Sequence, residues 1–303
     1  MSKKILLFPG QGSQYLGMGK KLAESHEGAK RVLDEANAVL GFDLADLMWN
    51  GPEERLTSTD NTQPALFTVS MMAWAWVKDR GLEASYAAGH SLGEYSALCA
   101  AGVFSFADGL KVVRLRGELM AKAGQARPGA MSAILGLERE ALEQALAKAS
   151  AEGAVVAANF NSLSQIVISG ESAAVAAAEQ AATELGAKKV VRLPVSGAFH
   201  SPLMEYAVDG LRAGLEAVTF SAPSVPVIQN VTAREESDPA ALKAGLLKQL
   251  TSPVRWVESM QRAQELGVTE AYEVGAGKVL MGLLRGISRD VKVTPVENPE
   301  DLA

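Results

Sequence analysis

The chain has 303 residues, of which 48% are hydrophobic and 21% charged, a composition typical of a globular protein that can bury a sizeable core. The formal net charge of -6 and the pI of about 5.3 argue against nucleic acid as the main partner. One cysteine excludes an intrachain disulfide, and with three histidines and no C-x-x-C pair a structural zinc site is not expected.

The apolar segments are too short for membrane insertion. Ile5 to Phe8 is a short apolar run that is stopped by Pro9-Gly10. A transmembrane helix needs about 18 or more apolar residues, and a signal peptide needs a longer apolar region with a small-residue cleavage site. We therefore expect a cytoplasmic protein without a membrane partner.

The first third of the chain alternates short apolar strands with longer helices. Lys4–Phe8 predicts a buried strand, and residues 18–40 have the apolar spacing of a helix. Another helix is predicted to begin near residue 62, with Asn61 or Thr62 as its cap and Pro64 in its first turn.

The same alternation continues around residue 90 and returns after residue 200. Tyr86–Gly89 predicts a short strand, and Leu92–Ala101 an apolar helix. Later strands are predicted near 225–231, 270–274 and 291–296, and Arg234–Asp238 is interpreted as a solvated loop. This order of elements favours an α/β core with a mostly parallel sheet.

The middle of the chain follows a different order, β-α-β-β-α-β, which is typical of a ferredoxin-like unit. We predict these six elements at 131–135, 139–151, 155–161, 165–169, 172–185 and 189–195. With linkers at 124–129 and 194–198, we expect a small ferredoxin-like domain at 127–196. It would be inserted into a catalytic core formed by residues 1–126 and 197–303.

A candidate nucleophile lies between the predicted strand and helix near residue 90. Gly89-His-Ser-Leu-Gly93 fits G-x-S-x-G in the strand–turn–helix context that gives this motif its meaning. The glycines permit a sharp turn that exposes the Ser91 hydroxyl. The N–H of Leu92, at a helix N-terminus, can then point at a developing oxyanion. The alternative is a tight turn that happens to contain serine.

A serine nucleophile needs a base, and the chain offers three histidines. His26 lies in a charged helical stretch and is expected on the surface. His90 adjoins Ser91, and neighbouring side chains near a strand end point apart, so a packing or orienting role is expected for it. His200 follows the last strand of the predicted small domain, where the two domains rejoin. Because clefts between domains are favoured sites, His200 is the preferred base.

The turn after the first strand does not fit a nucleotide-binding loop. Tyr15 stands where G-x-G-x-x-G needs its third glycine, and Met18-Gly19 replaces the Lys and Ser/Thr of a Walker motif. The backbone N–H of Gln11 could be a second oxyanion donor, and a plain β-α turn is the alternative.

Arg114 and Arg116 share a predicted helix over 110–120 and lie about 200° apart on its helical wheel. Only one of them can therefore face a site. A buried arginine needs an anion, and a carboxylate is its best match. Spacing does not distinguish the two, and both could also be surface residues.

Together these pieces resemble the malonyl-CoA:acyl-carrier-protein transacylase family. The ordered set spans residues 8 to 256 and is highly specific, although each motif is weak alone. The matching stretches are Phe8-Pro-Gly-Gln-Gly-Ser-Gln14, Asn61-Thr-Gln-Pro-Ala65, Gly89-His-Ser-Leu-Gly-Glu94, Arg116-Gly117, Gln165-Ile-Val-Ile-Ser-Gly170, Gly197-Ala-Phe-His-Ser201 and Gln249-Leu-x-x-Pro-Val-Arg-Trp256.

The resemblance implies a fold, an α/β-hydrolase-like core with a ferredoxin-like small domain, and a set of roles. Ser91 would be the nucleophile and His200 the base, with the N–H groups of Gln11 and Leu92 as the oxyanion hole. The remaining implied roles are Arg116 for the malonyl carboxylate, the Gln249 backbone carbonyl to orient His200, Gln63 near the site, and Phe199 with His90 as the selector against methylmalonyl.

The implied activity is transfer of malonyl from malonyl-CoA to the phosphopantetheine thiol of an acyl-carrier protein in fatty-acid synthesis, with no bound cofactor or metal. Because such carriers are acidic and this chain is also net negative, we expect a local basic patch at Lys188, Lys189, Arg285 and Arg289. The alternatives are an acyltransferase of polyketide synthesis, a serine hydrolase and a non-catalytic carrier-docking module. A hydrolase would use the order Ser…Asp/Glu…His, and a docking module would be expected to lack the serine or the histidine.

Overall fold

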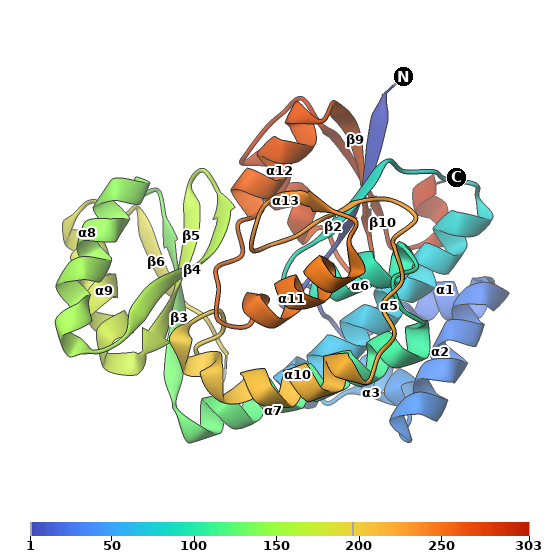
Figure 1. The fold of residues 1–303 in the computed structure, drawn as a ribbon, viewed down its shortest axis with the longest axis horizontal. Coiled ribbons are helices and arrows are strands. Elements are labelled where there is room, and N and C mark those ends of the chain that lie inside the picture. Colours follow the sequence, from blue (N-terminus) through green and yellow to red (C-terminus); the bar gives the residue numbers. More distant parts are fainter. Residues whose placement is uncertain (1, 196, 303) are drawn as a thin grey trace.

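The computed structural model describes residues 2–195 and 197–302, and within these ranges the strands form two separate sheets (Figure 1). The larger sheet has six strands, and its neighbouring strands are parallel except for the antiparallel pair β7–β8. In spatial order they are β10 (Lys292–Val296), β9 (Val268–Val274), β1 (Lys3–Phe8), β2 (Tyr86–Gly89), β7 (Val227–Ile228) and β8 (Glu235–Glu236).

The smaller sheet has four strands in the order β4-β5-β3-β6, and all its neighbouring pairs are antiparallel. It lies to the left in Figure 1, and its apolar face packs against two helices in a core of its own. Along the chain its elements are β3 (Gly129–Leu135), α8 (Arg139–Ala149), β4 (Val155–Ser162), β5 (Gln165–Glu171), α9 (Ser172–Glu184) and β6 (Lys189–Arg192).

Helices surround the larger sheet on both faces (Figure 1). They are α1 (Lys20–Ser25), α2 (Glu27–Leu40), α3 (Leu44–Asn50), α4 (Glu53–Thr57), α5 (Thr59–Asp79), α6 (Leu92–Ala100), α7 (Phe106–Ala126), α10 (Val208–Glu216), α11 (Pro239–Gln249), α12 (Trp256–Glu265) and α13 (Val279–Arg285). Three short 3-10 helices complete the fold, η1 (Ser150–Glu152), η2 (Pro202–Ala207) and η3 (Pro299–Leu302).

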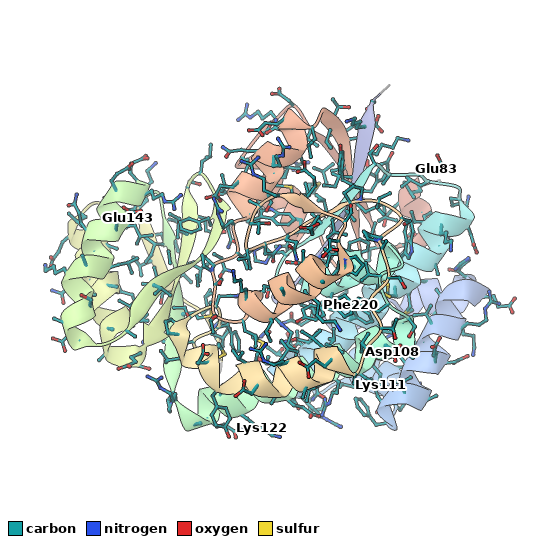
Figure 2. All side chains as sticks on the ribbon, viewed as in Figure 1. Glu83, Asp108, Lys111, Lys122, Glu143 and Phe220 are labelled. Carbon is teal, nitrogen blue, oxygen red and sulfur yellow. The ribbon has the colours of Figure 1, made fainter. Side chains whose placement is uncertain are left out.

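Strand β1 is central because its side chains are buried on both faces. Leu6 and Phe8 pack into the core on one face of the sheet, and Ile5 and Leu7 into the core on the other. Parallel sheets covered on both faces have such continuous apolar strands, which explains why the Ile5–Phe8 run reads as a buried strand. Charged side chains such as Glu83, Lys122 and Glu143 lie at the periphery (Figure 2).

Helix α5 begins earlier than the sequence predicts. Its N-cap is Ser58, and Pro64 lies inside the helix rather than in its first turn. A proline removes the N–H that would bond to the carbonyl four residues earlier, here that of Asp60. Arg114 Nη1 donates to the Asp60 oxygen instead, at 2.7 Å. The lost helical bond is replaced from α7, so the proline is tolerated.

Other predicted boundaries also shift. Residues 18–40 form two helices, because His26 ends α1 and caps α2, its Nδ1 accepting the Ala29 N–H at 3.1 Å. His26 also contacts Asp79, so it is not the freely solvated residue that was expected. Part of the predicted loop at 234–238 is the edge strand β8, where Glu235 pairs with Arg262.

The linker expected at 124–129 is shorter than predicted, since α7 continues to Ala126 and β3 begins at Gly129. The smaller sheet is also bonded directly to the loop after α11. Val254, in the loop after α11, accepts the Phe160 N–H and donates to the Ala158 carbonyl of β4, at 2.9 and 2.8 Å. No helix within residues 2–195 and 197–302 is both long and apolar enough to cross a membrane.

Candidate active site

Ser91 lies in a strained turn between β2 and α6. Its backbone has φ 52° and ψ -108°, a conformation that serine rarely adopts. The flanking glycines are required by close packing. A Cβ at Gly89 would lie 1.9 Å from the backbone of Gly93, and a Cβ at Gly93 would lie 2.0 Å from the Phe8 oxygen. The G-x-S-x-G spacing therefore produces a tight elbow that presents the serine side chain.

Ser91 and His200 are in direct contact. Ser91 Oγ lies 2.7 Å from His200 Nε2, and His200 Nδ1 lies 2.8 Å from the backbone oxygen of Gln249. Because a carbonyl only accepts, Nδ1 carries the proton and Nε2 is left as the acceptor for the serine hydroxyl. Burial and the nearby Arg116 charge lower the pKa of His200 to about 3, so the imidazole is neutral at physiological pH and its Nε2 lone pair is free.

Arg116 is almost fully buried beside this pair, with 1% of its surface exposed. Its Nη1 donates to Gln63 Oε1 at 2.7 Å, and its Nη2 to Ser91 Oγ and Gln249 Oε1, both at 3.1 Å. Its Nε is buried without a hydrogen-bond partner among residues 2–195 and 197–302. The guanidinium thus meets only neutral oxygens and keeps a free donor.

Arg114 lies elsewhere on α7. It is about a quarter exposed and contacts Asp60 and Glu118. The helical wheel left the choice between the two arginines open. In the structure, Arg116 is the one that faces Ser91.

These residues line a cleft of about 140 Å³ between the two sheets. Ser91, Arg116 and His200 line it together with Gln11 and Leu92. The smaller sheet contributes residues such as Met131 and Val167. The full lining is Gln11, His90, Ser91, Leu92, Arg116, Met120, Met131, Asn159, Asn161, Val167, Leu193, Val195, Phe199 and His200.

The two residues expected to supply backbone donors, Gln11 and Leu92, both line this cleft. Leu92 is the first residue of α6, so its N–H has no acceptor within the helix and lies at the positive end of the helix dipole. Gln11 lies in the turn after β1 and lines the same cleft. Such donors stabilise the negative oxygen that forms when a nucleophile attacks a carbonyl.

His90 points away from the serine. Its Nε2 lies 2.8 Å from Asn161 Oδ1 of β4, and its ring packs 5.5 Å from that of Trp256. It therefore links the elbow to the smaller sheet, in agreement with the expected packing or orienting place. Burial lowers the pKa of His90.

Two polar residues of the site were given no role in the sequence analysis. Asn230 holds the elbow from both sides, because its Oδ1 accepts the Ser91 N–H and its Nδ2 donates to the Gly89 oxygen, both at 2.7 Å. Glu94 is fully buried three residues after Ser91. A usable signal existed for Asn230, since polar residues just beyond the carboxyl end of a parallel strand commonly face a site.

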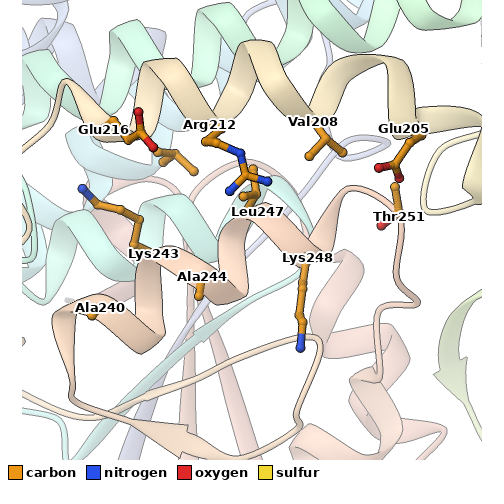
Figure 3. Close-up of a pocket in the computed structure, with 11 residues that line it drawn as sticks. Glu205, Val208, Arg212, Glu216, Ala240, Lys243, Ala244, Leu247, Lys248 and Thr251 are labelled. Atoms are coloured by element: carbon orange, nitrogen blue, oxygen red, sulfur yellow. The ribbon is translucent and has the colours of Figure 1, made fainter.

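A separate groove of about 490 Å³ lies between α10 and α11 (Figure 3). Neither Ser91 nor His200 lines it, so this groove is separate from the cleft that contains the serine–histidine pair. The lining residues are Glu205, Val208, Arg212, Leu215, Glu216, Ala240, Lys243, Ala244, Leu247, Lys248 and Thr251.

Fold and site together define an α/β protein with a serine–histidine pair and a buried arginine in one cleft, a set suited to acyl chemistry. A model of the family described as acyl transferase domain matches residues 5–293. The chain belongs to this acyl transferase family.

Named relatives are similar over almost their full length. The malonyl CoA-acyl carrier protein transacylase of Bacillus subtilis is 47% identical, with 100% of this chain and 96% of the relative covered. An acyl carrier protein S-malonyltransferase structure from Vibrio cholerae is 45% identical, with a TM-score of 0.96 and 99% of both chains covered. A malonyl-transacylase solved with a type II PKS acyl-carrier protein is 41% identical, with a TM-score of 0.96, covering 99% of this chain and 98% of that one.

Ionisation of Glu94 should cost stability. Burial raises its pKa from 4.5 to about 7, so the folded state holds the proton more tightly than the unfolded state. The resulting stabilisation is fully present below pH 4.5 and is lost as the pH rises through 7. Relative to the wild type, Glu94→Gln should therefore gain up to about 3 kcal/mol in free energy of unfolding between pH 5 and 8.5.

Urea denaturation of both proteins across this pH range measures the difference. His90 and His200 are present in both the variant and the wild type, so their contributions to the pH dependence of stability cancel in the difference. Glu83→Gln, at an exposed carboxylate, is the control and should follow the wild type. A Glu94→Gln difference that stays constant with pH would contradict the prediction.

Proposed function

We propose that this protein transfers malonyl from malonyl-CoA to the phosphopantetheine thiol of an acyl-carrier protein, for fatty-acid synthesis. The observation that carries the proposal is Arg116, a buried guanidinium that donates to Ser91 Oγ at 3.1 Å and is hydrogen-bonded to no carboxylate among residues 2–195 and 197–302. A malonyl group bound to Ser91 would bring that carboxylate. The names of the relatives at 40–47% identity support the same substrate and carrier.

The first half-reaction loads the serine. His200 Nε2 takes the proton from Ser91 Oγ as the oxygen attacks the thioester carbonyl carbon. The resulting oxyanion is held by the N–H groups of Gln11 and Leu92, each contributing about 2.7–4 kcal/mol by analogy with measured oxyanion donors. The carbon–sulfur bond then breaks, the coenzyme A thiolate leaves with the proton from His200, and a malonyl-serine ester remains.

The second half-reaction transfers the malonyl group from Ser91 to the carrier protein. The carrier's thiol gives its proton to His200, its sulfur attacks the ester carbonyl, and the proton passes to Ser91 Oγ as the carbon–oxygen bond breaks. The Gln249 carbonyl keeps the imidazole oriented throughout, in place of the carboxylate of a triad. A thioester is already activated, so we propose that the reaction needs no bound cofactor or metal.

The two sheets suggest a division into domains. We propose an α/β-hydrolase-like catalytic core at residues 1–126 and 197–303 and a ferredoxin-like domain at 127–196. The β3-α8-β4-β5-α9-β6 order and the antiparallel β4-β5-β3-β6 sheet support the second assignment. The mostly parallel sheet with the elbow after β2 supports the first.

Polyketide synthesis is the second candidate pathway. One solved relative, 41% identical, is described as the malonyl-transacylase of a type II PKS acyl-carrier protein. The chemistry at Ser91 is the same in both pathways, so the choice depends on which carrier protein is the partner.

The covalent intermediate is testable by mass. Mixing the protein with malonyl-CoA should add one malonyl group to Ser91, visible in the intact mass and located by peptide mapping. Ser91→Ala should form no adduct, and His200→Ala should form it on the order of 10⁶-fold more slowly by analogy with serine–histidine hydrolases. An adduct that persists in Ser91→Ala would disprove the assignment, and free malonate without carrier would indicate a hydrolase.

Carrier docking should depend on the basic patch. Arg285 and Arg289 line one hollow of about 630 Å³ together with Lys292. The β4–β5 turn joins this region to Lys188, because Leu163 donates to the Gly286 oxygen at 3.4 Å and the turn also bonds to the β3–α8 loop. The patch therefore spans both sheets.

Reversing the charge with Arg285→Glu and Arg289→Glu should raise the KM for the carrier protein, more at low than at high salt, and spare the KM for malonyl-CoA. Steady-state kinetics at two ionic strengths measure both constants. Arg31→Glu is the matched control, because Arg31 is exposed on α2 and does not line the hollow. Equal effects on both substrates would rule out the patch as a carrier site.

Two residues should determine which acyl group is accepted: Arg116 should select against acetyl and Phe199 against methylmalonyl. Acetyl lacks the carboxylate and would leave Arg116 buried and unpaired, so rejection could approach ~10⁴-fold. Arg116→Ala should narrow the malonyl-over-acetyl ratio. Phe199, buried in the cleft, would exclude the α-methyl branch of methylmalonyl, a contact worth roughly 1–3 kcal/mol.

Phe199→Ser should therefore admit methylmalonyl without admitting acetyl. A competition assay with the three thioesters on wild type and both variants separates these effects. An Arg116→Ala variant that keeps the full malonyl preference would refute the role of the arginine.

A further inference from the structure

Glu94 is a fully buried carboxylate beneath the site. It is the third residue of α6, and its oxygens do not reach the cleft. One oxygen, Oε2, accepts the Asn230 backbone N–H at 2.9 Å and the Gln249 Nε2 at 2.8 Å. The other, Oε1, accepts Gln229 Nε2 at 3.5 Å. A buried charge is costly, so its presence beneath the site points to a function.

The side-chain amide of Gln249 lies between Glu94 and Arg116. Its Oε1 accepts from Arg116 Nη2 at 3.1 Å, and its Nε2 donates to Glu94 Oε2 at 2.8 Å and to the Ser91 carbonyl at 3.1 Å. An arginine has no acceptor and an ionised carboxylate has no donor. The two charged groups therefore dictate which end of the amide faces each of them.

This arrangement separates two opposite charges by one amide. A carboxylate in direct contact with Arg116 would pair with it and neutralise it. The amide instead presents a neutral oxygen to the guanidinium, while Glu94 still balances the buried positive charge from a greater distance. The charge of Arg116 remains available to an anion in the cleft.

We propose that Glu94 is a positioning residue, which orients the Gln249 amide so that Arg116 stays fixed yet open to the carboxylate of the substrate. The inference rests on the proposed function, since it concerns how Arg116 selects malonyl. It assigns a role to a motif residue that neither acts on the substrate nor touches it.

The test exchanges the two side chains, as the double variant Glu94→Gln with Gln249→Glu. Side-chain lengths and total charge change little, and the Gln249 backbone carbonyl that holds His200 is retained. The carboxylate, however, moves from one amide away to direct contact with Arg116. The malonyl-over-acetyl ratio of kcat/KM should fall by about tenfold or more, with the loss mainly in the KM for malonyl-CoA.

Assays are run at pH 8, because burial raises the pKa of Glu94 to about 7 and the carboxylate must be ionised. Glu273→Gln is the matched control. Glu273 is equally buried, its pKa is raised to about 7 by the same cause, and it binds the N–H groups of Leu280 and Met281 away from the cleft. The malonyl-over-acetyl ratio of kcat/KM of the Glu273→Gln variant should equal that of the wild type.

A second variant protects the test against misfolding. Glu94→Gln alone keeps the shape but removes the charge that dictates the amide's orientation. The KM for malonyl-CoA should rise while acetyl transfer changes little, a split that a merely structural defect would not produce. An unchanged KM and an unchanged malonyl-over-acetyl ratio in the folded variants would overturn the proposal.

The wild type and Arg116→Ala separate this outcome from a failure of the proposed function. If wild type forms no malonyl-Ser91, or if Arg116→Ala keeps its malonyl preference, the proposed function itself is wrong. If both behave as expected and the exchange leaves the ratio intact, Glu94 has no positioning role.

Discussion

The buried guanidinium of Arg116 is the constraint on which the rest of the site depends. A charge removed from water needs hydrogen-bonding partners, and here it receives neutral oxygens from α5, from Ser91 at the N-cap of α6, and from α11. Three helices must therefore meet around one side chain. The same helices carry the elbow and the carbonyl that holds His200, so the position of the arginine and the alignment of the serine–histidine pair are set by one packing arrangement.

Two of the three non-glycine residues with positive φ in the described structure, Ser91 and His200, lie at the cleft, and the third is Ala233. Ser91 and His200 both have positive φ, at 52° and 57°, a region that side chains other than glycine seldom occupy. Such conformations persist only where surrounding contacts over-determine them. Asn230 fixes the serine backbone and the Gln249 carbonyl fixes the imidazole, so both strained residues are held by polar contacts within the described structure.

Much of the architecture could be predicted from the sequence because it depends on local patterns. The apolar strand at Ile5–Phe8, the elbow around Ser91 and the β-α-β-β-α-β order all follow from periodicity and turn chemistry. Elimination among three histidines pointed to His200, which the structure brings to Ser91. Ser91 and His200 are 109 residues apart in the chain, so local patterns do not pair them. The choice was possible because the chain has three histidines.

Features that depend on tertiary contacts could not be predicted. Pro64 looked like a helix start, because nothing local shows that Arg114 would replace its missing hydrogen bond. Asn230 and Glu94 act through partners more than a hundred residues away. The choice between Arg114 and Arg116 needed either the resemblance or the structure, since both fit the same helical spacing.

The backbone bridge between β4 and the loop after α11 has a consequence for how the cleft can move. Val254 lies in the loop just after the helix that ends at Gln249. Both its N–H and its carbonyl form hydrogen bonds to the backbone of β4. Swinging the smaller sheet away from the larger one would break these bonds and pull on the segment that orients His200. These two bonds therefore hold β4 beside the loop that follows Gln249, and they oppose a widening of the cleft that Ser91, Phe199 and His200 line.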